Sequence, residues 1–332
     1  MQNVDVYLIL TRNCNSSCSF CIRKNLEEIT STMNLSDAVK ALDIISEALP
    51  QSTLILTGGE PLLHHDIFSI IKYSLKKWSK VVLTSNGSFS TYTAELLKKY
   101  LSKNLWLQLS LDGPENEHDS IRGKGSFRKL TNNILYLKSV YSNIIISTTI
   151  TNKTLKSSFH LADILNNYKF SFWKVCPEQV ENPLSENLIN STVWNKFTKD
   201  ILLHCAYPVR IKQYFNFELM DYALEQGIKP TIYNCGCGKT KIYIDSNGTL
   251  SLCSCMTFPL GNIFTTPISN WVEKWDKAGK IIPSNDSICK TCKYVTICNG
   301  GCLGYSLKVF GKMDMGDIRC PIVFNSIKNG QY

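Results

Sequence analysis

Several features that assign a protein to a class are missing from these 332 residues. No apolar run reaches the roughly 18 residues needed to cross a bilayer. The N-terminal stretch MQNVDVYLILTRNC reaches polar Thr11, Arg12 and Asn13 without a basic leader, so it does not resemble an export signal. There is also no repeat of fixed period and no long low-complexity tract. We therefore expect a folded, soluble, cytoplasmic protein without a membrane segment.

Dense basic runs are missing too, although the formal charge is +9, from 36 Lys and Arg against 27 Asp and Glu. Basic residues are scattered in stretches such as YSLKKWSK (73–80) and LLKKYLSK (96–103), which is typical of solvated helix faces. Cysteines that bind a metal do so as thiolates, and their charge would offset much of this excess. The charge balance therefore gives no support for DNA binding.

Cysteine is abundant, at 14 residues. In a chain without an export signal we do not expect a disulfide framework, because the cytosol keeps thiols reduced. The distribution is uneven, since Cys14, Cys18 and Cys21 lie close together and nine more cysteines lie from Cys235 onward. Metal binding is the leading interpretation of this clustering.

Short apolar runs rich in β-branched residues alternate with amphipathic stretches, which predicts βα units with parallel strands. We expect the first helix to have Ser36 as its N-cap and to end before Pro50. Six such units suit an α/β fold, a partial (β/α)6 TIM-like barrel with its active site at the carboxyl ends of the strands. The six expected strands are 4–10, 53–57, 80–85, 105–111, 143–151 and 170–176.

The character of the chain changes after about residue 215, where long helical stretches become rare and cysteines become frequent. A region of this kind depends on cross-links or metals for its stability. We expect two domains, a barrel over residues 1–227 and a cysteine-rich domain over residues 228–332.

The segment CNSSCSFC (14–21) directly follows the first expected strand. Three closely spaced thiolates can bind three irons of a 4Fe-4S cube, and a fourth cysteine is missing nearby. An iron without a protein ligand can bind a substrate or cofactor, just as a catalytic zinc keeps an open position. A zinc site with a distant fourth ligand is the weaker alternative, because zinc motifs usually use pairs of cysteines.

This C-x3-C-x2-C spacing resembles the signature of the radical S-adenosylmethionine (SAM) superfamily. Three further motifs agree in order and position: LTGGEP (56–61), TSNG (84–87) and SLDG (110–113). Each tetrapeptide alone is compatible with an ordinary turn, but four motifs in register with the strands are hard to explain as turns.

The resemblance implies a SAM site at these motifs. Gly58, Gly59 and Glu60 would contact the amino group of SAM, and glycine suits a backbone that approaches a ligand closely. Arg122 in HDSIRGKGSF (118–127) would pair with a carboxylate of SAM or of the substrate, and a surface arginine is the alternative. The ribose and carboxylate of SAM would be held by Ser85, Asn86 and Ser110.

The order of the C-terminal cysteines resembles the SPASM extension of radical SAM enzymes, which holds two auxiliary clusters. The resemblance assigns the second auxiliary cluster to Cys289, Cys292, Cys298 and Cys320. It assigns the first to Cys235, Cys253 and Cys302, with Cys237 as the favoured fourth ligand and Cys255 or an open iron as alternatives. A zinc-ribbon-like pair of C-x2-C sites is the alternative for the whole set.

Cys176 and Cys205 are left over. Cys205 is expected to be a buried small apolar residue. Cys176 ends the sixth strand and faces the expected site, where a thiol can donate a hydrogen atom to a radical, but a packed core cysteine is the more common situation.

The resemblance also implies a reaction. SAM is cleaved reductively at the cluster of Cys14, Cys18 and Cys21, and the 5′-deoxyadenosyl radical that results abstracts a hydrogen atom from an unactivated carbon. Most relatives with this extension modify peptides, so the expected substrate is a ribosomally made precursor peptide. The product would be a thioether, carbon–carbon or carbon–oxygen cross-link or another side-chain or backbone modification. The expected cofactors are SAM and three 4Fe-4S clusters, with flavodoxin or ferredoxin as electron donor.

Two features bear on the type of peptide chemistry. In sulfatase-maturing relatives an aspartate follows the equivalent of Cys253, whereas Ser254 stands here, which disfavours that side-chain oxidation without removing it. Thirteen residues precede Cys14, too few for an N-terminal leader-binding module, so we expect a separate leader-binding protein or direct recognition by the barrel. The alternatives from other classes are a non-catalytic iron–sulfur electron carrier and a zinc-stabilised interaction protein.

Overall fold

A computed structural model describes residues 4–22, 31–138, 141–180, 188–212, 215–227, 236–254, 256 and 258–330. Its central element is one ten-stranded sheet in the order β10-β9-β8-β1-β2-β3-β4-β5-β6-β7. Neighbours from β8 to β7 are parallel, whereas β9 pairs antiparallel with both β8 and β10. The strands are β1 (Asp5–Ile9), β2 (Thr53–Thr57), β3 (Val81–Ser85), β4 (Leu105–Ser110), β5 (Ile144–Ile150), β6 (Phe172–Pro177), β7 (Val209–Ile211), β8 (Lys241–Ile244), β9 (Thr249–Ser251) and β10 (Pro259–Asn262).

The expected α/β fold is confirmed, and β1 to β6 lie within two residues of the six predicted strands. The sequence did not reveal that the C-terminal region extends the same sheet. Strand β8 pairs in parallel with β1, which places Tyr243 beside Tyr7. Strands β7 to β10 have three or four residues each, too few for a periodic pattern to stand out. The predicted boundary at 227/228 adjoins residues 228–235, which lie outside the described part of the chain.

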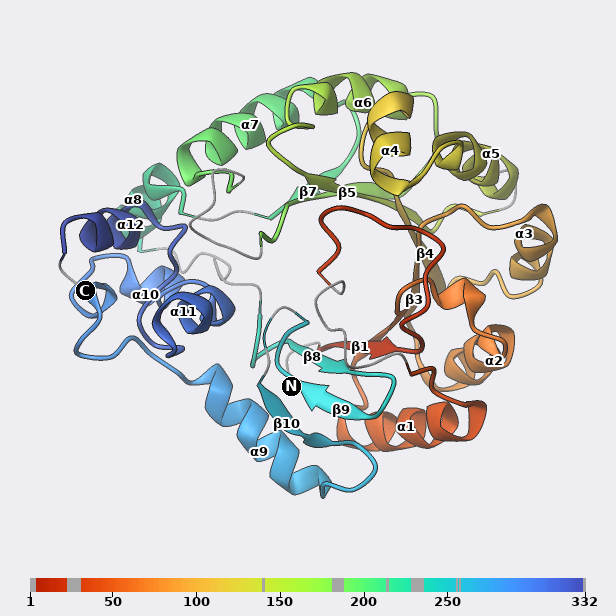
Figure 1. Ribbon diagram of the computed structural model, residues 1–332, viewed down its shortest axis with the longest axis horizontal. Helices are drawn as coiled ribbons and strands as arrows, with labels where there is room; N and C mark the ends of the chain where they lie inside the picture. The colour runs from red at the N-terminus through yellow and green to blue at the C-terminus, as the bar shows by residue number, and fades with distance from the viewer. Residues whose placement is uncertain are drawn as a thin grey trace.

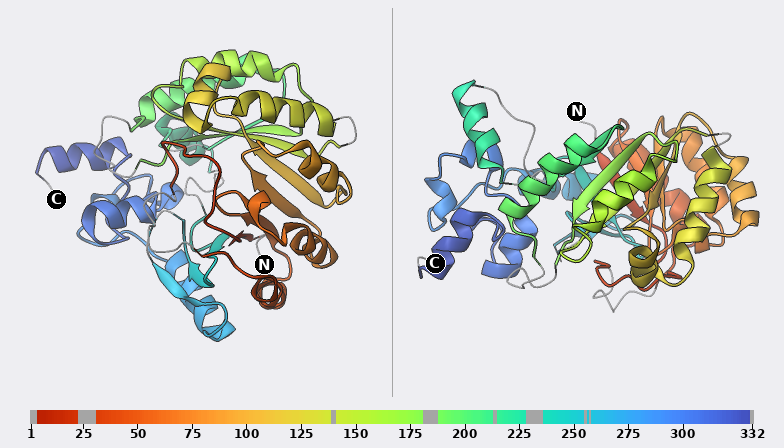
Figure 2. Two further views of the ribbon diagram at one scale, coloured as in Figure 1. Left: turned by 45° about the vertical axis from the view of Figure 1, so that its right-hand side comes forward. Right: turned by 90° about the horizontal axis from the view of Figure 1, so that it is seen from above.

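Helices cover the convex face of the curved sheet, so that the strands surround a central space (Figures 1 and 2). The residues that point toward the helices are fully buried and apolar, as Leu8, Leu56 and Ile146 show with 0% exposure. The helices are α1 (Leu35–Ala48), α2 (Ile67–Lys77), α3 (Thr91–Lys98), α4 (Glu115–Arg122), α5 (Ser126–Lys138), α6 (Ser157–Leu165), α7 (Ser191–His204), α8 (Phe217–Glu225), α9 (Ile268–Gly279), α10 (Val295–Cys298), α11 (Leu303–Phe310) and α12 (Pro321–Lys328), with short 3₁₀ helices η1 (Pro61–Leu63) and η2 (Ile288–Lys290).

The start of α1 differs from the prediction. Asn34, and not Ser36, is the N-cap, because its side-chain oxygen accepts a hydrogen bond of 2.8 Å from Asp37 N. The Asn34 amide also donates to the Asp37 carboxylate at 2.9 Å, which gives the cap a second bond. The helix ends at Ala48, ahead of Pro50 as expected.

The C-terminal helices gather at one end of the molecule, beside α8 (Figure 1). Helices α10 and α11 are separated by two glycines with positive φ angles, Gly300 and Gly301. None of the described helices is long and apolar enough to cross a membrane.

Candidate functional site

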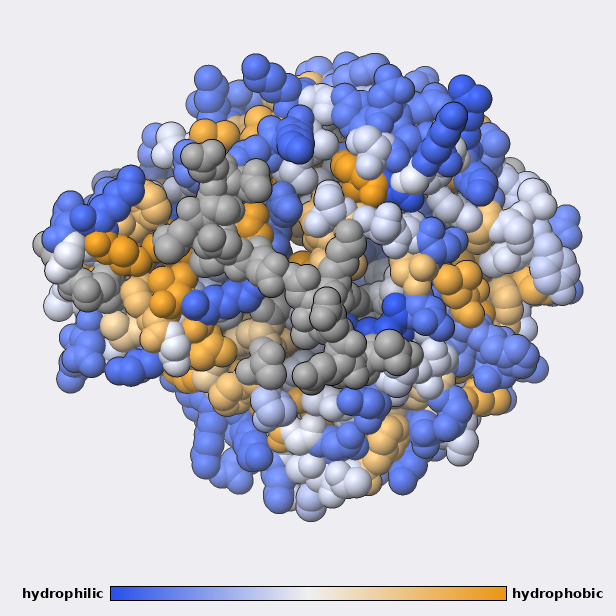
Figure 3. Space-filling model, in the orientation of Figure 1, coloured by the Kyte–Doolittle hydropathy of each residue, from blue (hydrophilic) through white to orange (hydrophobic). Residues whose placement is uncertain are grey.

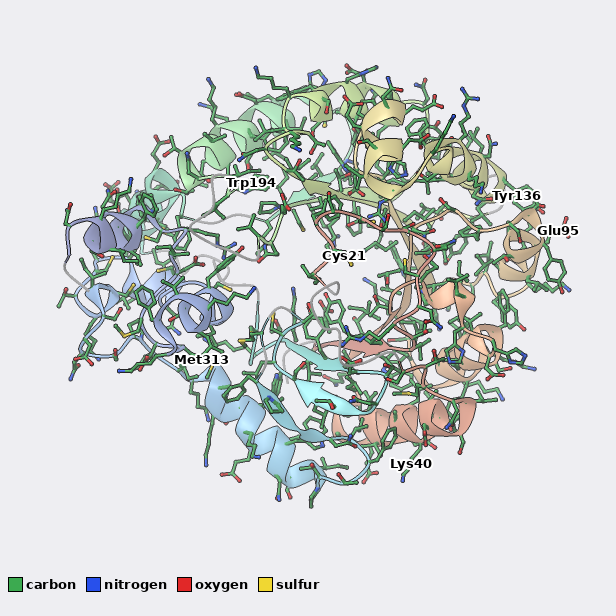
Figure 4. The ribbon with its side chains drawn as sticks, viewed as in Figure 1. Cys21, Lys40, Glu95, Tyr136, Trp194 and Met313 are labelled. Atoms are coloured by element: carbon green, nitrogen blue, oxygen red, sulfur yellow. The ribbon has the colours of Figure 1, made fainter. Side chains whose placement is uncertain are left out.

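The three N-terminal cysteines lie in the loop that leaves the carboxyl end of β1. Cys18 is buried, whereas Cys14 and Cys21 are exposed. The loop is turned locally by Ser16 N, which donates to Cys14 Sγ at 3.4 Å, and by Cys21 N, which donates to Cys18 O at 3.2 Å. Figure 4 places Cys21 near the centre of the molecule, inside the ring of strands. The loop therefore presents thiols to the central space.

The start of this cysteine loop rests directly on the GGEP loop after β2. Gly59 N donates to Thr11 O at 2.7 Å, and Glu60 N donates to Asn13 O at 2.8 Å. A methyl group added at Gly58 would lie 2.5 Å from Thr11 O, and one added at Gly59 would overlap the carbonyl of Asn13. The sequence suggested that these glycines serve the approach of a ligand; the structure shows that the approach of two loop backbones already requires them.

Glu60 lies beneath the cysteine loop with 3% of its surface exposed. Its carboxylate accepts hydrogen bonds from Asn86 N at 2.7 Å and Leu62 N at 3.1 Å. Burial raises the pKa of Glu60, and these donors oppose the rise. Because the carboxylate is desolvated, it is well suited to pair with a cationic group of a ligand.

The TSNG loop after β3 connects to the same loops. Asn86 Nδ2 donates to Asn15 Oδ1 at 2.6 Å, so the motif reaches the residue that follows Cys14. Ser85 Oγ accepts from Gly87 N at 3.0 Å and shares a hydrogen bond with Glu60. The structure thus brings Glu60, Ser85 and Asn86 together with the cysteine loop. Ser110, half-buried at the end of β4, lies beside Ser147 of β5.

Arg122, the last residue of α4, forms an ion pair with Asp112 of the SLDG motif. The side chains are 11% and 1% exposed, so the alternative of a surface arginine is wrong, and the arginine is paired with a carboxylate of the chain itself. Asp112 also accepts a hydrogen bond of 2.8 Å from Thr149 N, which anchors the pair to β5. Burial raises the pKa of Cys18, and the positive charge of Arg122 opposes that rise. Arg122 is therefore close enough to the thiols to favour their deprotonated form.

His118 is a buried residue of this region that the sequence did not single out. Its Nδ1 accepts a hydrogen bond of 3.2 Å from Asp112 N, so the ring proton is on Nε2. Within the described part of the chain, Nε2 has no hydrogen-bond partner. Burial lowers the pKa of His118 to about 4, with Arg122 acting in the same direction and Asp112 opposing it. The imidazole is thus neutral at neutral pH and holds the Asp112 backbone in place.

The C-terminal region also contacts the start of the cysteine loop. The Arg12 guanidinium forms a bidentate ion pair with Asp245, which follows β8, and one of the two bonds is Nε to Oδ1 at 3.0 Å. The two side chains are 8% and 14% exposed. Next to this pair, the hydroxyls of Ser31 and Ser246 are 2.8 Å apart. Nothing in the sequence pattern linked Arg12 with Asp245, which are 233 positions apart.

Four of the C-terminal cysteines line one cavity together with aromatic side chains. Burial raises the pKa of Cys298 to about 11 and that of Cys320 to about 12, so as free thiols both are protonated at neutral pH. Iron or zinc would have to displace these protons. The cavity is lined by Cys289, Cys292, Cys298 and Cys320 with Phe215, Phe217, Tyr294, Val295, Gly300, Ile322 and Val323.

Cys302 does not line this cavity, and its backbone contacts a buried ion pair. Cys302 N donates to Asp317 Oδ2 at 3.0 Å, and Asp317 is paired with Arg319, with side chains that are 1% and 4% exposed. Cys237 lines a different cavity, beside Gly301 and Leu303, which flank Cys302 in the chain. Cys235 and Cys255, two candidate ligands of the same cluster, lie outside the described residues.

The arrangement of the cysteine thiols distinguishes an iron–sulfur cluster from a single zinc ion. Across the ranges that the structure describes, no three Cys, His, Asp or Glu side chains converge on a point where one metal ion could bind. A 4Fe-4S cube binds its four cysteines at four separate irons, and the three thiols of the first loop, with a buried carboxylate and a guanidinium close by, fit such a cluster and an amino-acid ligand. Cys176 lies on the inner face of β6, half-buried, and Cys205 caps the end of α7.

Comparisons with known proteins agree with this geometry. Residues 8–159 match the model of the radical SAM superfamily. The chain is 23% identical over 327 residues to the AdoMet-dependent heme synthase of Nitratidesulfovibrio vulgaris, covering 91% of this chain and 88% of that protein. It is 34% identical over 131 residues to the subtilosin biosynthesis protein AlbA of Bacillus subtilis, covering 39% and 29%. The fold matches SuiB of Streptococcus suis, solved with its precursor peptide SuiA, with a TM-score of 0.78 at 18% identity over 96% of this chain and 76% of that one.

We expect Gly59→Ala to separate the two loops, because its methyl group would overlap the Asn13 backbone. The free energy of unfolding should fall by about 1–3 kcal/mol, the usual cost of overpacking, and iron bound at the first loop should be lost more quickly to a chelator. Gly304→Ala is the control, since its methyl group would meet only ordinary contacts at 3.7–3.8 Å. Equal stability of the two variants in urea would contradict the close approach.

Asp245→Asn should release the cysteine loop from the C-terminal region. Removing one partner of a buried pair leaves the other charge uncompensated, at a cost of about 3 kcal/mol, and hydrogen exchange of the amides in residues 11–16 should accelerate. Asp276→Asn removes an exposed partner of Lys280, whose side chain is 73% exposed, and serves as the control. If the two variants exchange at the same rate as wild type in this loop, the ion pair does not hold it.

His118 should make stability depend on pH. Its pKa is about 4 in the folded chain against 6.5 ordinarily, so the unfolded chain binds the proton more readily and stability falls as pH drops below 6.5. Denaturation should show a loss of about 2 kcal/mol between pH 7 and pH 5 in wild type. This loss should shrink in His118→Asn, in which the amide oxygen can replace Nδ1, and persist in the exposed control His160→Asn. An unchanged slope in His118→Asn would disprove the assignment.

Proposed function

We propose, on the premise that this chain is an enzyme with a radical SAM domain, that it modifies a ribosomally synthesised precursor peptide by abstracting a hydrogen atom from it. The observation that carries the proposal is that four C-terminal cysteines line one cavity, so that the catalytic barrel is joined to a region suited to an auxiliary cluster. The alternative of a non-catalytic electron carrier is wrong, since the radical SAM domain makes the chain an enzyme.

The residues of the first site have separate roles in this proposal. Cys14, Cys18 and Cys21 would hold the cluster, which would supply the electron for cleavage of SAM. The desolvated Glu60 carboxylate would receive the ammonium group of SAM, and the guanidinium of Arg122, paired with Asp112, would attract the carboxylate of SAM. Ser85, Asn86 and Ser110 complete the polar surface around the ligand. The tight GGEP packing excludes water from beneath it.

The C-terminal cysteines serve electron transfer or substrate anchoring in the proposal. Cys289, Cys292, Cys298 and Cys320 hold one auxiliary cluster. Cys302 belongs to another, with Cys235, Cys253 and the candidate Cys237; this division is supported by the cavity that Cys237 lines together with Gly301 and Leu303, the two neighbours of Cys302 in the chain. An electron donor such as flavodoxin or ferredoxin and a separate leader-binding protein are the proposed partners.

Peptides are favoured as substrates by two comparisons. AlbA, the relative with 34% identity over 131 residues, is named for the biosynthesis of subtilosin, a bacteriocin. SuiB, whose fold matches nearly the whole chain, was solved with a precursor peptide. Cross-linking, by a thioether, carbon–carbon or carbon–oxygen bond, is the favoured modification, and Ser254 in place of an aspartate disfavours the sulfatase-maturing type of oxidation.

A second candidate is a reaction on a tetrapyrrole, of the kind named for the heme synthase relative and for an Fe-coproporphyrin III synthase that is 26% identical over 36% of this chain. It is favoured by the heme synthase relative, which aligns with 91% of this chain, whereas AlbA aligns with 39%. The two candidates share the radical chemistry and differ in the substrate, so substrate assays separate them.

The metal content is the first test. After anaerobic reconstitution we expect about twelve irons per chain, as for three 4Fe-4S clusters, and about eight after replacement of Cys14, Cys18 and Cys21 by Ala. Replacement of Cys289, Cys292, Cys298 and Cys320 should also leave about eight. The double replacement of Cys176 and Cys205 is the control and should leave the iron content unchanged. About four irons, with zinc in place of the rest, would show that the C-terminal region is structural.

The substrate is tested with the peptide encoded by a short reading frame beside the gene. Incubation with SAM and a reductant should yield 5′-deoxyadenosine together with a peptide that has lost two hydrogen atoms, as a cross-link requires. Formation of 5′-deoxyadenosine without any change in the peptide, combined with turnover of coproporphyrin III, would replace the peptide by the tetrapyrrole.

A further inference from the structure

The inner face of the sheet carries polar side chains that the face under the helices lacks. Strand residues alternate between the two faces, and the inner positions include the half-buried Tyr7, Gln108, Ser147, Lys174 and Tyr243 beside the buried apolar Ile55, Val82 and Ile145. A closed eight-stranded barrel fills this position with branched apolar side chains. Figure 3 shows the molecule hollowed near the centre of this view, where the strands surround that face. The inner face therefore offers polar groups at the positions around Lys174.

Positive charge predominates on this inner face. Asp5 is its one acidic residue among the described positions of the strands, and burial raises its pKa while Lys241, Lys174 and Lys80 oppose that rise. Lys80, which directly precedes β3, lies 4.8 Å from the ring centre of Trp106, and the exposed Arg210 of β7 lies 3.9 Å from that of Phe172. Within the described strands, Lys174, Arg210 and Lys241 thus accompany a single carboxylate.

Lys174 lies deepest among these cations, on the middle of β6. Its Nζ donates to the side-chain oxygen of Gln108 at 3.2 Å, so the described residues give it a neutral partner instead of a carboxylate. The stacked rings of Tyr7 and Tyr243, with centroids 4.4 Å apart, lie close enough for the charge of Lys174 to act on Tyr7. An ammonium group that is partly removed from water, with surplus donors, attracts an anion.

The strand register places Lys174 next to the candidate reaction site. Lys174 pairs laterally with Ser147 of β5, and Ser147 pairs with Ser110 of β4, the candidate contact for SAM. One pair further along β6, Cys176 lies beside Thr149, whose N–H binds Asp112. The side chain of Lys174 extends from this level toward Gln108, two residues before Ser110, and so away from the cysteine loop.

We propose that Lys174, with Gln108 and the Tyr7–Tyr243 pair, forms a subsite for a carboxylate of the substrate: an Asp or Glu side chain or the C-terminus of an acidic peptide. The inference rests on the proposed function and names the class of its substrate. The carboxylate would neutralise Lys174 and accept a hydrogen bond from the Gln108 amide, while Ser147 lies within the same row. Binding of the substrate carboxylate in this subsite would place a neighbouring carbon atom of the substrate beside Ser110, the candidate SAM contact.

A double-mutant cycle between enzyme and peptide tests the subsite. The enzymes are wild type, Lys174→Met, which keeps the length of the side chain, and Lys129→Met, which removes an exposed lysine on α5. The probes are fluorescein-labelled copies of the precursor encoded beside the gene, with each Asp or Glu changed in turn to Asn or Gln and with the C-terminus amidated. Binding is measured by anisotropy in the presence of SAM, and KM and kcat are measured for each pair.

We expect one such change in the peptide to weaken binding about tenfold to wild type and to Lys129→Met, and less than twofold to Lys174→Met. The effect should appear in KM and leave kcat nearly unchanged. Lys174→Glu should prefer the peptide that carries Lys at the same position. Equal losses with Lys174→Met and wild type would overturn the subsite. A weaker affinity of Lys174→Met for SAM itself would also overturn it, since Lys174 would then belong to the SAM site.

A second probe distinguishes failure of the peptide as substrate from failure of the carboxylate subsite. If wild type neither binds nor modifies any peptide, coproporphyrin III, which carries four carboxylates, replaces the peptide as probe and its binding is followed by absorbance. Weaker binding to Lys174→Met than to Lys129→Met would support the carboxylate subsite and overturn the peptide as its source. Equal binding to both variants would overturn the subsite together with the peptide proposal.

Discussion

The contact between two backbones, the start of the cysteine loop and the GGEP loop, is the constraint on which the catalytic end of the barrel depends. Two hydrogen bonds, Gly59 N to Thr11 O and Glu60 N to Asn13 O, join the ends of neighbouring parallel strands. The two loop backbones lie so close together that a methyl group on Gly58 or Gly59 would overlap the other loop. The position of one loop therefore determines the position of the other. The loop that carries the thiols and the loop that carries Glu60 consequently keep a fixed relative position, and neither can move without the other.

Charge is distributed around this unit in buried pairs. Arg122 and Asp112 lie on one side, and Arg12 and Asp245 lie on the other. Buried pairs of this kind contribute little net stability compared with apolar packing, but they tolerate very few alternative geometries once formed. Neutral His118 adds a fixed hydrogen bond behind Asp112. The surroundings of the cysteine loop are therefore held by the chain's own hydrogen bonds and ion pairs.

The C-terminal region belongs to the same sheet as the barrel, through the parallel pairing of β8 with β1. This pairing has two consequences for function. It brings Asp245 to the loop that carries the first cysteines, and it places Tyr243 against Tyr7 on the inner face. The C-terminal strands thus form a wall of the central space next to β1 (Figure 1).

The sequence alone determined the βα alternation, the six parallel strands and the grouping of motifs at strand ends, because these features depend on local periodicity and on residues close together in the chain. It also showed the close spacing of Cys14, Cys18 and Cys21, three thiols that together can bind irons of a 4Fe-4S cluster. It did not reveal the pairing of Arg12 with Asp245, the partner of Arg122, the burial of His118 or the cationic inner face around Lys174. Those features were decided only by the tertiary structure, because each depends on the curvature and register of the sheet, which bring together residues that no local pattern connects.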